Sequence, residues 1–361
     1  MSDKILKELP GVQKKILLKD YTTYKIGGPA KYFFIARTKD DLITAVKAAE
    51  KLKLPVFILG GGSNLLISEK GFNGLVIKID ISGIEFYPHT KRDDVAGENI
   101  NKDGSRSGVG VKANKAVVGA GAGLTKLAYL SADNGLSGLE WSAGVPGTLG
   151  GAIYGNAQAF GTKICDAIES IEAINLKTLE LKSFTKKQCQ FSLKNSIFKK
   201  NKNWVIVSAN LIFQKKDIKE IKNKINEFLE YRKTRHPIDF PSAGSTFVNP
   251  EINPHTRSLR GNFGVGVKIK KLYKKYPELE EYVKKGVIPS GYLIAKCGMA
   301  GKKIGNAQIS EKHSNFIINL GGAKAKDVLS LMASAKKKVK ANFGISLETE
   351  VQLVGFNRKI I

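Results

Sequence analysis

The sequence predicts an α+β protein with two or three domains. Its 361 residues are too many for one ordinary core, and apolar residues make up 42% of them. Segments with strand-like and helix-like patterns are mixed, without the strict alternation of a doubly wound sheet. Two glycine-rich runs, Gly60 to Asn64 and Gly144 to Gly161, lie far apart in this pattern. The fold class is therefore predicted from the mixed elements. The glycine runs indicate backbone that takes positive φ or lies close to a neighbour.

The first eighty residues are expected to form strands around one helix, followed by a glycine loop. Lys7 to Lys19 is polar and irregular, and residues 21–30 form a turn-rich lead into the first strand. Apolar residues at helical spacing follow Asp40, and Asp40 or Asp41 is suited to cap that helix. Strands are predicted at 32–36, 55–59 and 74–79, and the middle one is expected to be buried.

The segment from Pro88 to Lys115 is polar, charged and rich in glycine, with almost no apolar period. We interpret most of it as an exposed loop or hairpin insertion without chemistry of its own. A short helix then begins at Leu124 and stops at Asn134-Gly135. Residues 167–213 are mostly strands, and the alternation from Val205 to Phe213 predicts a sheet with one buried face.

The C-terminal part begins near Gln214, where we place a domain boundary. Apolar residues at helical spacing predict a helix from Ile218 to the neighbourhood of His236. Beyond it we expect a turn-rich segment at 241–250, helices at 292–297 and 324–343, and strands at 315–320 and 347–356. The last of these strands alternates between apolar and polar residues from Leu347 to Phe356.

The net charge of +27 raises the possibility of a polyanionic partner. Only eight of the 59 basic residues are arginine, and the lysines are dispersed along the chain. Nucleic-acid readers more often use arginine forks interleaved with aromatic residues, and no such block is present. A solvated lysine-rich surface that attracts small anions is therefore favoured, and polyanion binding is kept as an alternative.

No stretch reaches the apolar length of a membrane span, and residues 1–12 lack the apolar segment of a signal peptide. We therefore expect a cytoplasmic protein without a membrane partner. Cys165, Cys189 and Cys297 are far apart and lack the spacing of a zinc site. Reduced thiols and no metal are the expectation, and the sequence leaves the oligomeric state open.

The run from Gly144 to Gly161 carries six glycines and a proline. Glycine marks backbone that takes positive φ, or that lies too close to a neighbour for a Cβ atom. That neighbour could be an adjacent strand in a tight loop, or the ring or pyrophosphate of a nucleotide. The chain has no P-loop, and Gly119 to Leu124 misses the last glycine of a Rossmann fingerprint. Both interpretations stay open from the residues alone.

A set of segments spread over nearly the whole chain has a familiar order and spacing. They are Thr23 to Ala30, Leu59 to Asn64, Gly144 to Gly161, Phe191 to Lys199, Gly244 to Phe247, Ile304 to Ser310 and Leu347 to Val351. Together they resemble the UDP-N-acetylenolpyruvoylglucosamine reductase family, in its compact subtype. The resemblance implies a two-subdomain FAD-binding fold of the p-cresol methylhydroxylase type, plus a C-terminal α+β substrate domain. The implied domains are 1–80 joined by 351–361, 81–216 with an insertion at about 88–115, and 217–350.

The resemblance also implies an FAD-dependent oxidoreductase of peptidoglycan precursor synthesis. In that family NADPH reduces FAD, which then reduces the enolpyruvyl double bond of UDP-N-acetylglucosamine enolpyruvate to give UDP-N-acetylmuramate. The implied ligands are FAD, NADPH and a UDP-sugar, with neither nucleic acid nor membrane as partner. A flavin oxidase or dehydrogenase of the same fold, acting on another substrate, is the main alternative, and a polyanion-binding protein is a third.

Site residues follow from the resemblance by position. Ser245 matches the family's proton donor, and Glu350 matches the carboxyl group near the substrate carboxylate. The residues that match substrate contacts are Arg235, Asn249 and His313. Those that match FAD contacts are Gly28, Gly60, Gly61, Gly62, Ser63, Asn64, Gly123, Pro146, Gly147, Gly150 and Gly151. Without the resemblance, Ser245 and Asn249 would be read as turn residues, and Glu350 as an exposed strand residue.

Lys194 departs from the family pattern, which has arginine at this position and tyrosine where this chain has Leu193. An arginine fork holds a carboxylate through two parallel hydrogen bonds, whereas lysine is a point charge on a flexible stem. We therefore expect Lys194 to stabilise an enolate less well, unless another cation such as Arg232 or Arg235 compensates. Lys194 is nevertheless included among the catalytic candidates.

Overall fold

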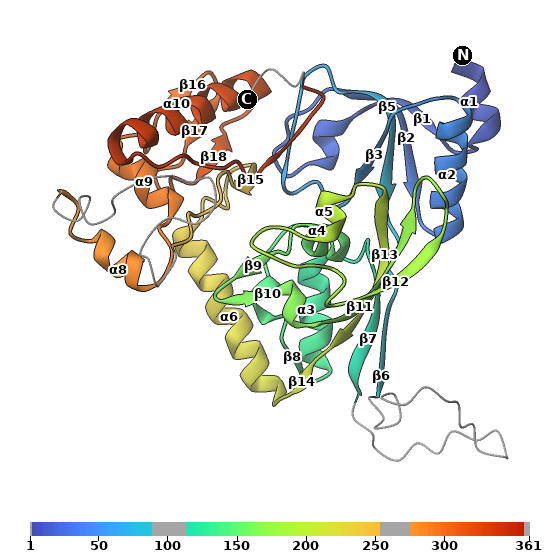
Figure 1. Ribbon diagram of the computed structural model, residues 1–361, viewed down its shortest axis with the longest axis horizontal. Coiled ribbons are helices and arrows are strands. Elements are labelled where there is room, and N and C mark those ends of the chain that lie inside the picture. The colour runs from blue at the N-terminus through green and yellow to red at the C-terminus, as the bar shows by residue number, and fades with distance from the viewer. Residues whose placement is uncertain (1, 89–112, 253–274, 357–361) are drawn as a thin grey trace.

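The computed structural model describes residues 2–88, 113–252 and 275–356, which form three sheet-centred parts (Figure 1). The N-terminal sheet has the order β1-β2-β5-β3, with β2 and β3 parallel to β5 and β1 antiparallel to β2. Its elements are α1 (Ser2–Glu8), β1 (Gln13–Leu17), the 3-10 helix η1 (Leu18–Tyr21), β2 (Pro29–Ala36), α2 (Lys39–Lys51), β3 (Val56–Leu59), β4 (Leu65–Ile67) and β5 (Phe72–Ile79). The ordered α1 and β1 correct the expectation that Lys7 to Lys19 is irregular.

Helix α2 packs on β2 and β5 of the N-terminal sheet. Its N-cap lies two residues before Asp40, the first of the acidic residues expected to cap it. The side chain of Thr38 accepts a hydrogen bond from the backbone N–H of Asp41, and the Asp41 carboxylate accepts one from the N–H of Thr38. Thr38 is therefore the N-cap, and Asp41 completes a capping box at the third helical position. The expected cap at Asp40 or Asp41 is therefore wrong, because the N-cap lies two or three residues earlier in the chain.

The middle sheet has the order β12-β11-β13-β7-β6, with every neighbouring pair antiparallel. Its strands are β6 (Ile84–Pro88), β7 (Ala113–Gly119), β11 (Ile168–Asn175), β12 (Leu181–Thr185) and β13 (Trp204–Ile212). Residues 205–209 of β13 are all buried, although alternate residues of a strand point to opposite faces. The prediction of one buried face is therefore wrong, because β13 is the central strand and both of its faces are covered.

Short helices and strands connect and cover this sheet. They are α3 (Leu124–Asp133), β8 (Leu136–Ser137), η2 (Glu140–Ser142), α4 (Leu149–Tyr154), β9 (Gln158–Ala159), β10 (Thr162–Lys163), η3 (Ile164–Asp166), α5 (Ile197–Lys200) and β14 (Gln214–Lys215). Helix α3 ends at Asp133 and has Asn134 as its C-cap, in agreement with the predicted stop at Asn134-Gly135. Of the insertion expected between Pro88 and Lys115, β6 and β7 provide the two ends, and residues 89–112 lie outside the described residues.

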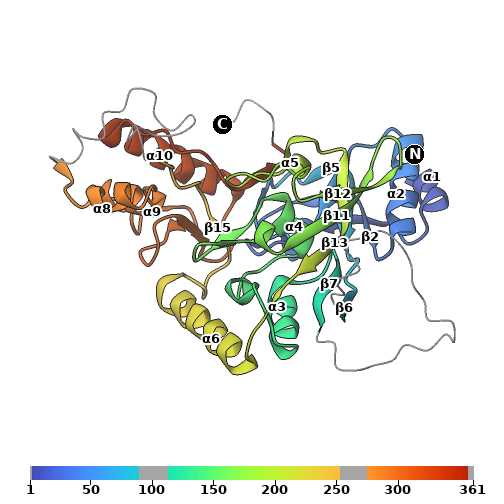
Figure 2. The same cartoon turned by 60° about the horizontal axis from the view of Figure 1, so that its bottom comes forward.

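The C-terminal part holds the third sheet, of order β15-β18-β17-β16, and its helices (Figure 1). Its elements are α6 (Ile218–Arg235), β15 (Ser242–Ser245), α8 (Leu279–Lys284), α9 (Ser290–Lys296), β16 (Lys303–Ile304), β17 (Ala307–Ile309), β18 (Phe316–Asn319), α10 (Ala325–Phe343) and β19 (Gln352–Val354). Figure 2 shows α6 lying beside α3 of the middle part, and the two helices are in contact.

The expected strand from Leu347 to Phe356 is shorter in the structure. Only β19 is a strand, and it pairs in parallel with β4 of the N-terminal part. The residues before it instead bind the segment after β15, because Val248 N–H donates to the carbonyl of Glu348 and Glu350 N–H donates to that of Thr246. The C-terminal segment therefore joins the third sheet to β4 of the N-terminal part, and Glu350 lies between the two contacts.

Candidate active site

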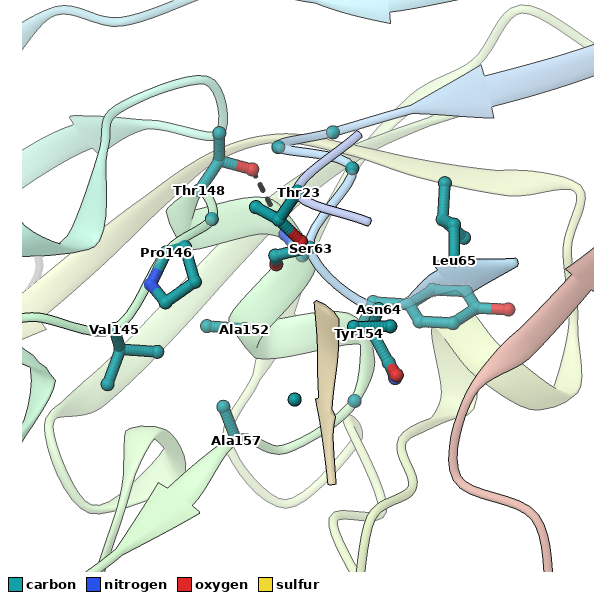
Figure 3. A pocket seen from close by; sticks show the side chains of 18 of the residues that line it. Thr23, Ser63, Asn64, Leu65, Val145, Pro146, Thr148, Ala152, Tyr154 and Ala157 are labelled. Carbon is teal, nitrogen blue, oxygen red and sulfur yellow. Dashed lines mark hydrogen bonds between the residues drawn. The ribbon is translucent and has the colours of Figure 1, made fainter. Parts of the chain in front are cut away.

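A single large cavity contains most of the residues singled out from the sequence. Its volume is about 970 Å³, near the upper end of the roughly 300–1,000 Å³ of ligand pockets. Both glycine runs line it, together with β13, the segment after α6, and β15. Figure 3 shows Ser63 of the first run close to Pro146 and Thr148 of the second. The cavity thus lies where the three parts of the chain meet.

The two glycine runs contact each other backbone to backbone. A Cβ atom on Gly61 would lie 2.5 Å from the Cα of Gly147, which is too close for any side chain. Gly62 has a φ of +65°, and a Cβ there would lie 1.9 Å from the carbonyl oxygen of Tyr21. The glycines therefore form a tight loop packed against protein, as the first interpretation holds. They also line the cavity, where a nucleotide could lie against them, as the second holds.

The first glycine run also presents unused hydrogen-bond donors. The backbone N–H groups of residues 60–64 donate to no acceptor in the described part of the chain. Successive free N–H groups in a loop form a concave anion site. In the second run the N–H of Gly151 donates to Thr148 Oγ1 at 3.4 Å, the dashed contact in Figure 3. A cradle of free amides beside bare glycine backbone fits the pyrophosphate of FAD.

Lys194, Ser245 and Glu350 all line the cavity, and we call the part of the lining that they form the reaction end. The ammonium of Lys194 lies 2.8 Å from the carboxylate of Glu350, and the two side chains are 22% and 14% exposed. Ser245 is connected to this pair through the next residue, because the carbonyl of Thr246 accepts a hydrogen bond from the backbone N–H of Glu350. Three segments far apart in sequence thus supply a cation, a hydroxyl and a carboxylate to one place.

Lys194 is held in a tight turn with an unusual backbone. Its φ is +51°, in the left-handed region that residues other than glycine rarely adopt. Ser192 and Asn195 close the turn by exchanging backbone hydrogen bonds, and the Asn156 amide donates to the carbonyl of Ser192 at 2.9 Å. Asn156 belongs to the second glycine run, so the turn that carries Lys194 is tied to that wall of the cavity.

Two further contacts connect the first glycine run to the reaction end. The hydroxyl of Thr23 donates to the carbonyl of Ser242 at 2.7 Å, and its N–H donates to the carbonyl of Gly62. The side-chain amide of Asn64 donates to the carbonyl of Glu350 at 3.2 Å. Ser242, at the start of β15, is therefore tied to the glycine loop through Thr23, and Glu350 is bonded to that loop directly.

Two cavity residues, Lys199 and His236, were missed by the sequence assignments. Lys199 ends one of the segments that carry the resemblance, and its Nζ donates to the carbonyl of Lys194 at 2.8 Å. His236 follows α6, and burial, together with nearby positive groups, lowers its pKa to about 4. The sequence signal for Lys199 was its place in the Phe191 to Lys199 segment, five residues after Lys194. His236 had no such signal, because a histidine before a proline indicates no particular role.

Arg232 lines the cavity but is already engaged by the protein. Its guanidinium donates to the carbonyls of Trp141 and Ala143 at 2.7 and 3.2 Å, and it lies over the ring of Phe160. Burial lowers the pKa of Arg232. Arg232 therefore fixes α6 against the second glycine run, and Arg235 is exposed outside the cavity lining.

The structure brings together most of the predicted site residues and leaves some apart. The residues that line the cavity are Lys194, Ser245, Glu350, Gly60, Gly61, Gly62, Ser63, Asn64, Pro146, Gly147, Gly150 and Gly151. Those outside its lining are Gly28, Gly123, Arg235, Asn249 and His313. Asn249 accepts a hydrogen bond from the N–H of Ser290, and the ring of His313 packs on that of His236 at 5.5 Å.

Gly28 and Gly123 serve the fold in different ways. A Cβ on Gly28 would lie 1.9 Å from the carbonyl oxygen of Glu69, so this glycine permits a backbone contact outside the cavity. Gly123 is the N-cap of α3 and has open space around it. Over residues 2–88, 113–252 and 275–356 there is no cluster of three metal-ligating side chains, and no helix is long and apolar enough to cross a membrane.

Comparisons with known proteins agree with this arrangement. Residues 30–178 match the model of an FAD binding domain, and residues 236–354 match that of the UDP-N-acetylenolpyruvoylglucosamine reductase C-terminal domain. The first of these domains contains both glycine runs, and the second contains Ser245 and Glu350. The expectations of FAD as cofactor and of an α+β fold built on an FAD-binding domain are confirmed.

Relatives match over almost the full chain. The UDP-N-acetylenolpyruvoylglucosamine reductase of Caldanaerobacter subterraneus subsp. tengcongensis is 33% identical over 338 residues, which cover 94% of this chain and 92% of that protein. That of Lachnoclostridium phytofermentans is 34% identical, with coverages of 94% and 91%. The crystal structure of the Thermus caldophilus reductase superposes with a TM-score of 0.65 at 27% identity, covering 95% and 98%. The chain therefore belongs to the UDP-N-acetylenolpyruvoylglucosamine reductase family.

Proposed function

We propose that this chain uses NADPH and bound FAD to reduce the enolpyruvyl double bond of UDP-N-acetylglucosamine enolpyruvate, giving UDP-N-acetylmuramate for peptidoglycan synthesis. The observation that carries the proposal is the Lys194–Glu350 pair beside Ser245, in a cavity that both glycine runs line. The family membership supports the same reaction. The two glycine runs would hold FAD, which would supply the redox chemistry that connects NADPH to the enolpyruvyl double bond.

Ser245 is proposed to deliver the proton that completes the reduction. Addition of hydride to the terminal carbon leaves negative charge on the carbon next to the substrate carboxylate. A serine hydroxyl can protonate this carbon despite its high pKa, because the carbanionic centre is far more basic than an ordinary conjugate base. Ser245 ends β15 and lines the cavity, so its hydroxyl is available at the reaction end.

Lys194 and Glu350 are proposed to control charge at the carbon that Ser245 protonates. The Lys194 ammonium stabilises the enolate that forms when hydride adds, and partial burial strengthens this interaction relative to one in water. The Glu350 carboxylate holds Lys194 in place at 2.8 Å. The pair therefore replaces the arginine fork with a lysine whose position is set by a carboxylate.

The remaining ligands follow from the same reaction. A UDP-sugar and NADPH are the small-molecule partners, and the charge of +27 favours the approach of both anions. Arg235, Asn249 and His313 remain proposed substrate contacts, although none of them lines the cavity. We also propose the cytoplasmic location expected from the sequence, where NADPH is available.

Steady-state turnover with the purified, flavin-loaded protein tests the proposal. We expect NADPH consumption to depend on added UDP-N-acetylglucosamine enolpyruvate and to match, mole for mole, a product heavier by two hydrogen atoms. UDP-N-acetylglucosamine, which lacks the enolpyruvyl group, is the matched control and should support no turnover above background. Equal NADPH consumption with both compounds, without a reduced sugar product, would reject the proposed substrate.

A further inference from the structure

A second lysine belongs to the reaction end. Lys199 lies in the last turn of α5, lines the cavity, and donates from Nζ to the carbonyl of Lys194 at 2.8 Å. Burial lowers the pKa of Lys199, the charge of Glu350 counteracts that effect, and the charge of Lys194 adds to it. Lys199 is therefore close enough to interact electrostatically with both members of the ion pair.

The three charges at this end do not cancel. Lys194 and Glu350 neutralise each other through their contact at 2.8 Å, and Lys199 adds a further ammonium. Two of its three N–H donors remain after the bond to the Lys194 carbonyl. Arg232, an arginine of the cavity lining, is bound by the carbonyls of Trp141 and Ala143. The reaction end thus has a surplus positive charge that the pair alone does not supply.

We propose that Lys199 is a substrate-binding cation that receives the carboxylate of the enolpyruvyl group beside Lys194. The inference rests on the proposed function and adds to it a residue for recognition of the substrate carboxylate. One arginine presents several donors to a carboxylate, whereas one lysine presents a single point charge. Lys194 and Lys199 together restore two charged donors, and the bond to the Lys194 carbonyl limits the entropy that Lys199 loses on binding.

Substitution of Lys199 in the flavin-loaded enzyme tests this role. Lys199→Met removes the charge and the donor, Lys199→Gln removes the charge but keeps a donor for the Lys194 carbonyl, and Lys199→Arg keeps both. Lys200→Met is the matched control, because Lys200 is the exposed neighbour on the same helix and does not line the cavity. Dissociation constants for UDP-N-acetylglucosamine enolpyruvate and for UDP-N-acetylglucosamine are read from flavin absorbance changes or by calorimetry.

The proposal predicts selective loss of carboxylate recognition. Lys199→Met and Lys199→Gln should weaken binding of the enolpyruvate roughly tenfold to a hundredfold, the usual range for a hydrogen bond to a charged group. Binding of UDP-N-acetylglucosamine, reduction of FAD by NADPH and FAD content should stay unchanged. Lys199→Arg should restore binding, and Lys200→Met should match the wild type.

Other outcomes overturn the proposal. Wild-type enolpyruvate affinity in both Lys199→Met and Lys199→Gln would show that the charge is not used. Rescue by Gln alone would make Lys199 a positioning residue for Lys194, and equal weakening of both ligands would indicate a structural role. If the wild type itself reduces no enolpyruvate, the proposed function fails first. If it does reduce enolpyruvate and the variants do not differ, only the role of Lys199 fails.

Discussion

Lys194 and Glu350 form an ion pair of 2.8 Å between a turn of the middle part and the C-terminal segment, which joins the third sheet to β4 of the N-terminal part. A pair with side chains 22% and 14% exposed interacts more strongly than one on the surface. Lysine stands at position 194 where the family has arginine, and its side chain is the more flexible of the two. The contact with Glu350 therefore holds the Lys194 ammonium in place. The pair thus connects the least typical residue of the chain to the proposed chemistry.

Replacement of Lys194 tests its contribution to the enolate. Lys194→Met should lower kcat by about 10² to 10³, the usual effect of removing one donor that stabilises developing negative charge. Lys194→Arg should keep or raise kcat, because the fork can contact Glu350 and the substrate together. Steady-state kinetics with the enolpyruvyl substrate measures both. Unchanged kcat in Lys194→Met would remove Lys194 from the mechanism.

Ser245→Ala should separate the two halves of the catalytic cycle. Loss of the proton donor should slow reduction of the enolpyruvyl group by about 10² to 10⁴, while NADPH still reduces bound FAD at the wild-type rate. Stopped-flow absorbance of the flavin under anaerobic conditions follows each half separately. If both halves slow together, the hydroxyl is not the proton donor.

Gly61→Ala should disrupt the contact between the glycine runs. Its Cβ would lie 2.5 Å from the Cα of Gly147, so the backbone must move, at a cost of about 1–3 kcal/mol. We expect weaker FAD retention through gel filtration and a lower Tm. Gly123→Ala is the control, since open space surrounds Gly123 and its φ of −69° suits alanine. Similar FAD content in the two variants would contradict a role for this contact.

His236 should make stability depend on pH. Burial, the first cause, and the nearby His313, Arg232 and Lys312 lower its pKa from 6.5 to about 4. Between these values the unfolded chain binds more protons than the folded one, so the free energy of unfolding falls as pH drops through this window. The loss is up to about 2 kcal/mol once solvent screening of the half-buried ring is allowed for.

Denaturant unfolding at several pH values between 7 and 4 measures this effect. His236→Gln should reduce the slope of unfolding free energy against pH, and the remainder should include a contribution of the same sign from His313, whose pKa burial also lowers. An identical slope in wild type and His236→Gln would show that His236 is protonated equally in both states.

Elements with a clear local period could be predicted from the sequence. Helices α2, α3, α6 and α10 lie close to their expected ranges, because their apolar faces and stop signals are encoded within one segment. Strand β1 was missed because its stability comes from pairing with β2, a partner that local residues do not reveal. The same reason shortens the final strand, since residues 347–351 bind the segment after β15 instead of a neighbouring strand.

The site was predictable where residue type alone carries the signal. The glycines at 60–62 and 147–151 stood out in this way, whereas the lysine in place of arginine at 194 was found only through the family resemblance. Lys199 and His236 could not be singled out, because a lysine and a histidine gain a role only from what folding places beside them. The ion pair between Lys194 and Glu350 could not be predicted either, since nothing in one segment reveals the other as its neighbour.

The most direct test of the central claim is reoxidation of the reduced enzyme by its proposed substrate. The flavin-loaded protein is reduced with one equivalent of NADPH without oxygen and then mixed with UDP-N-acetylglucosamine enolpyruvate. We predict that the absorbance band of oxidised flavin returns fully, with one equivalent of reduced sugar formed. A flavin that stays reduced with the enolpyruvate, yet is reoxidised by oxygen, would contradict the proposed function.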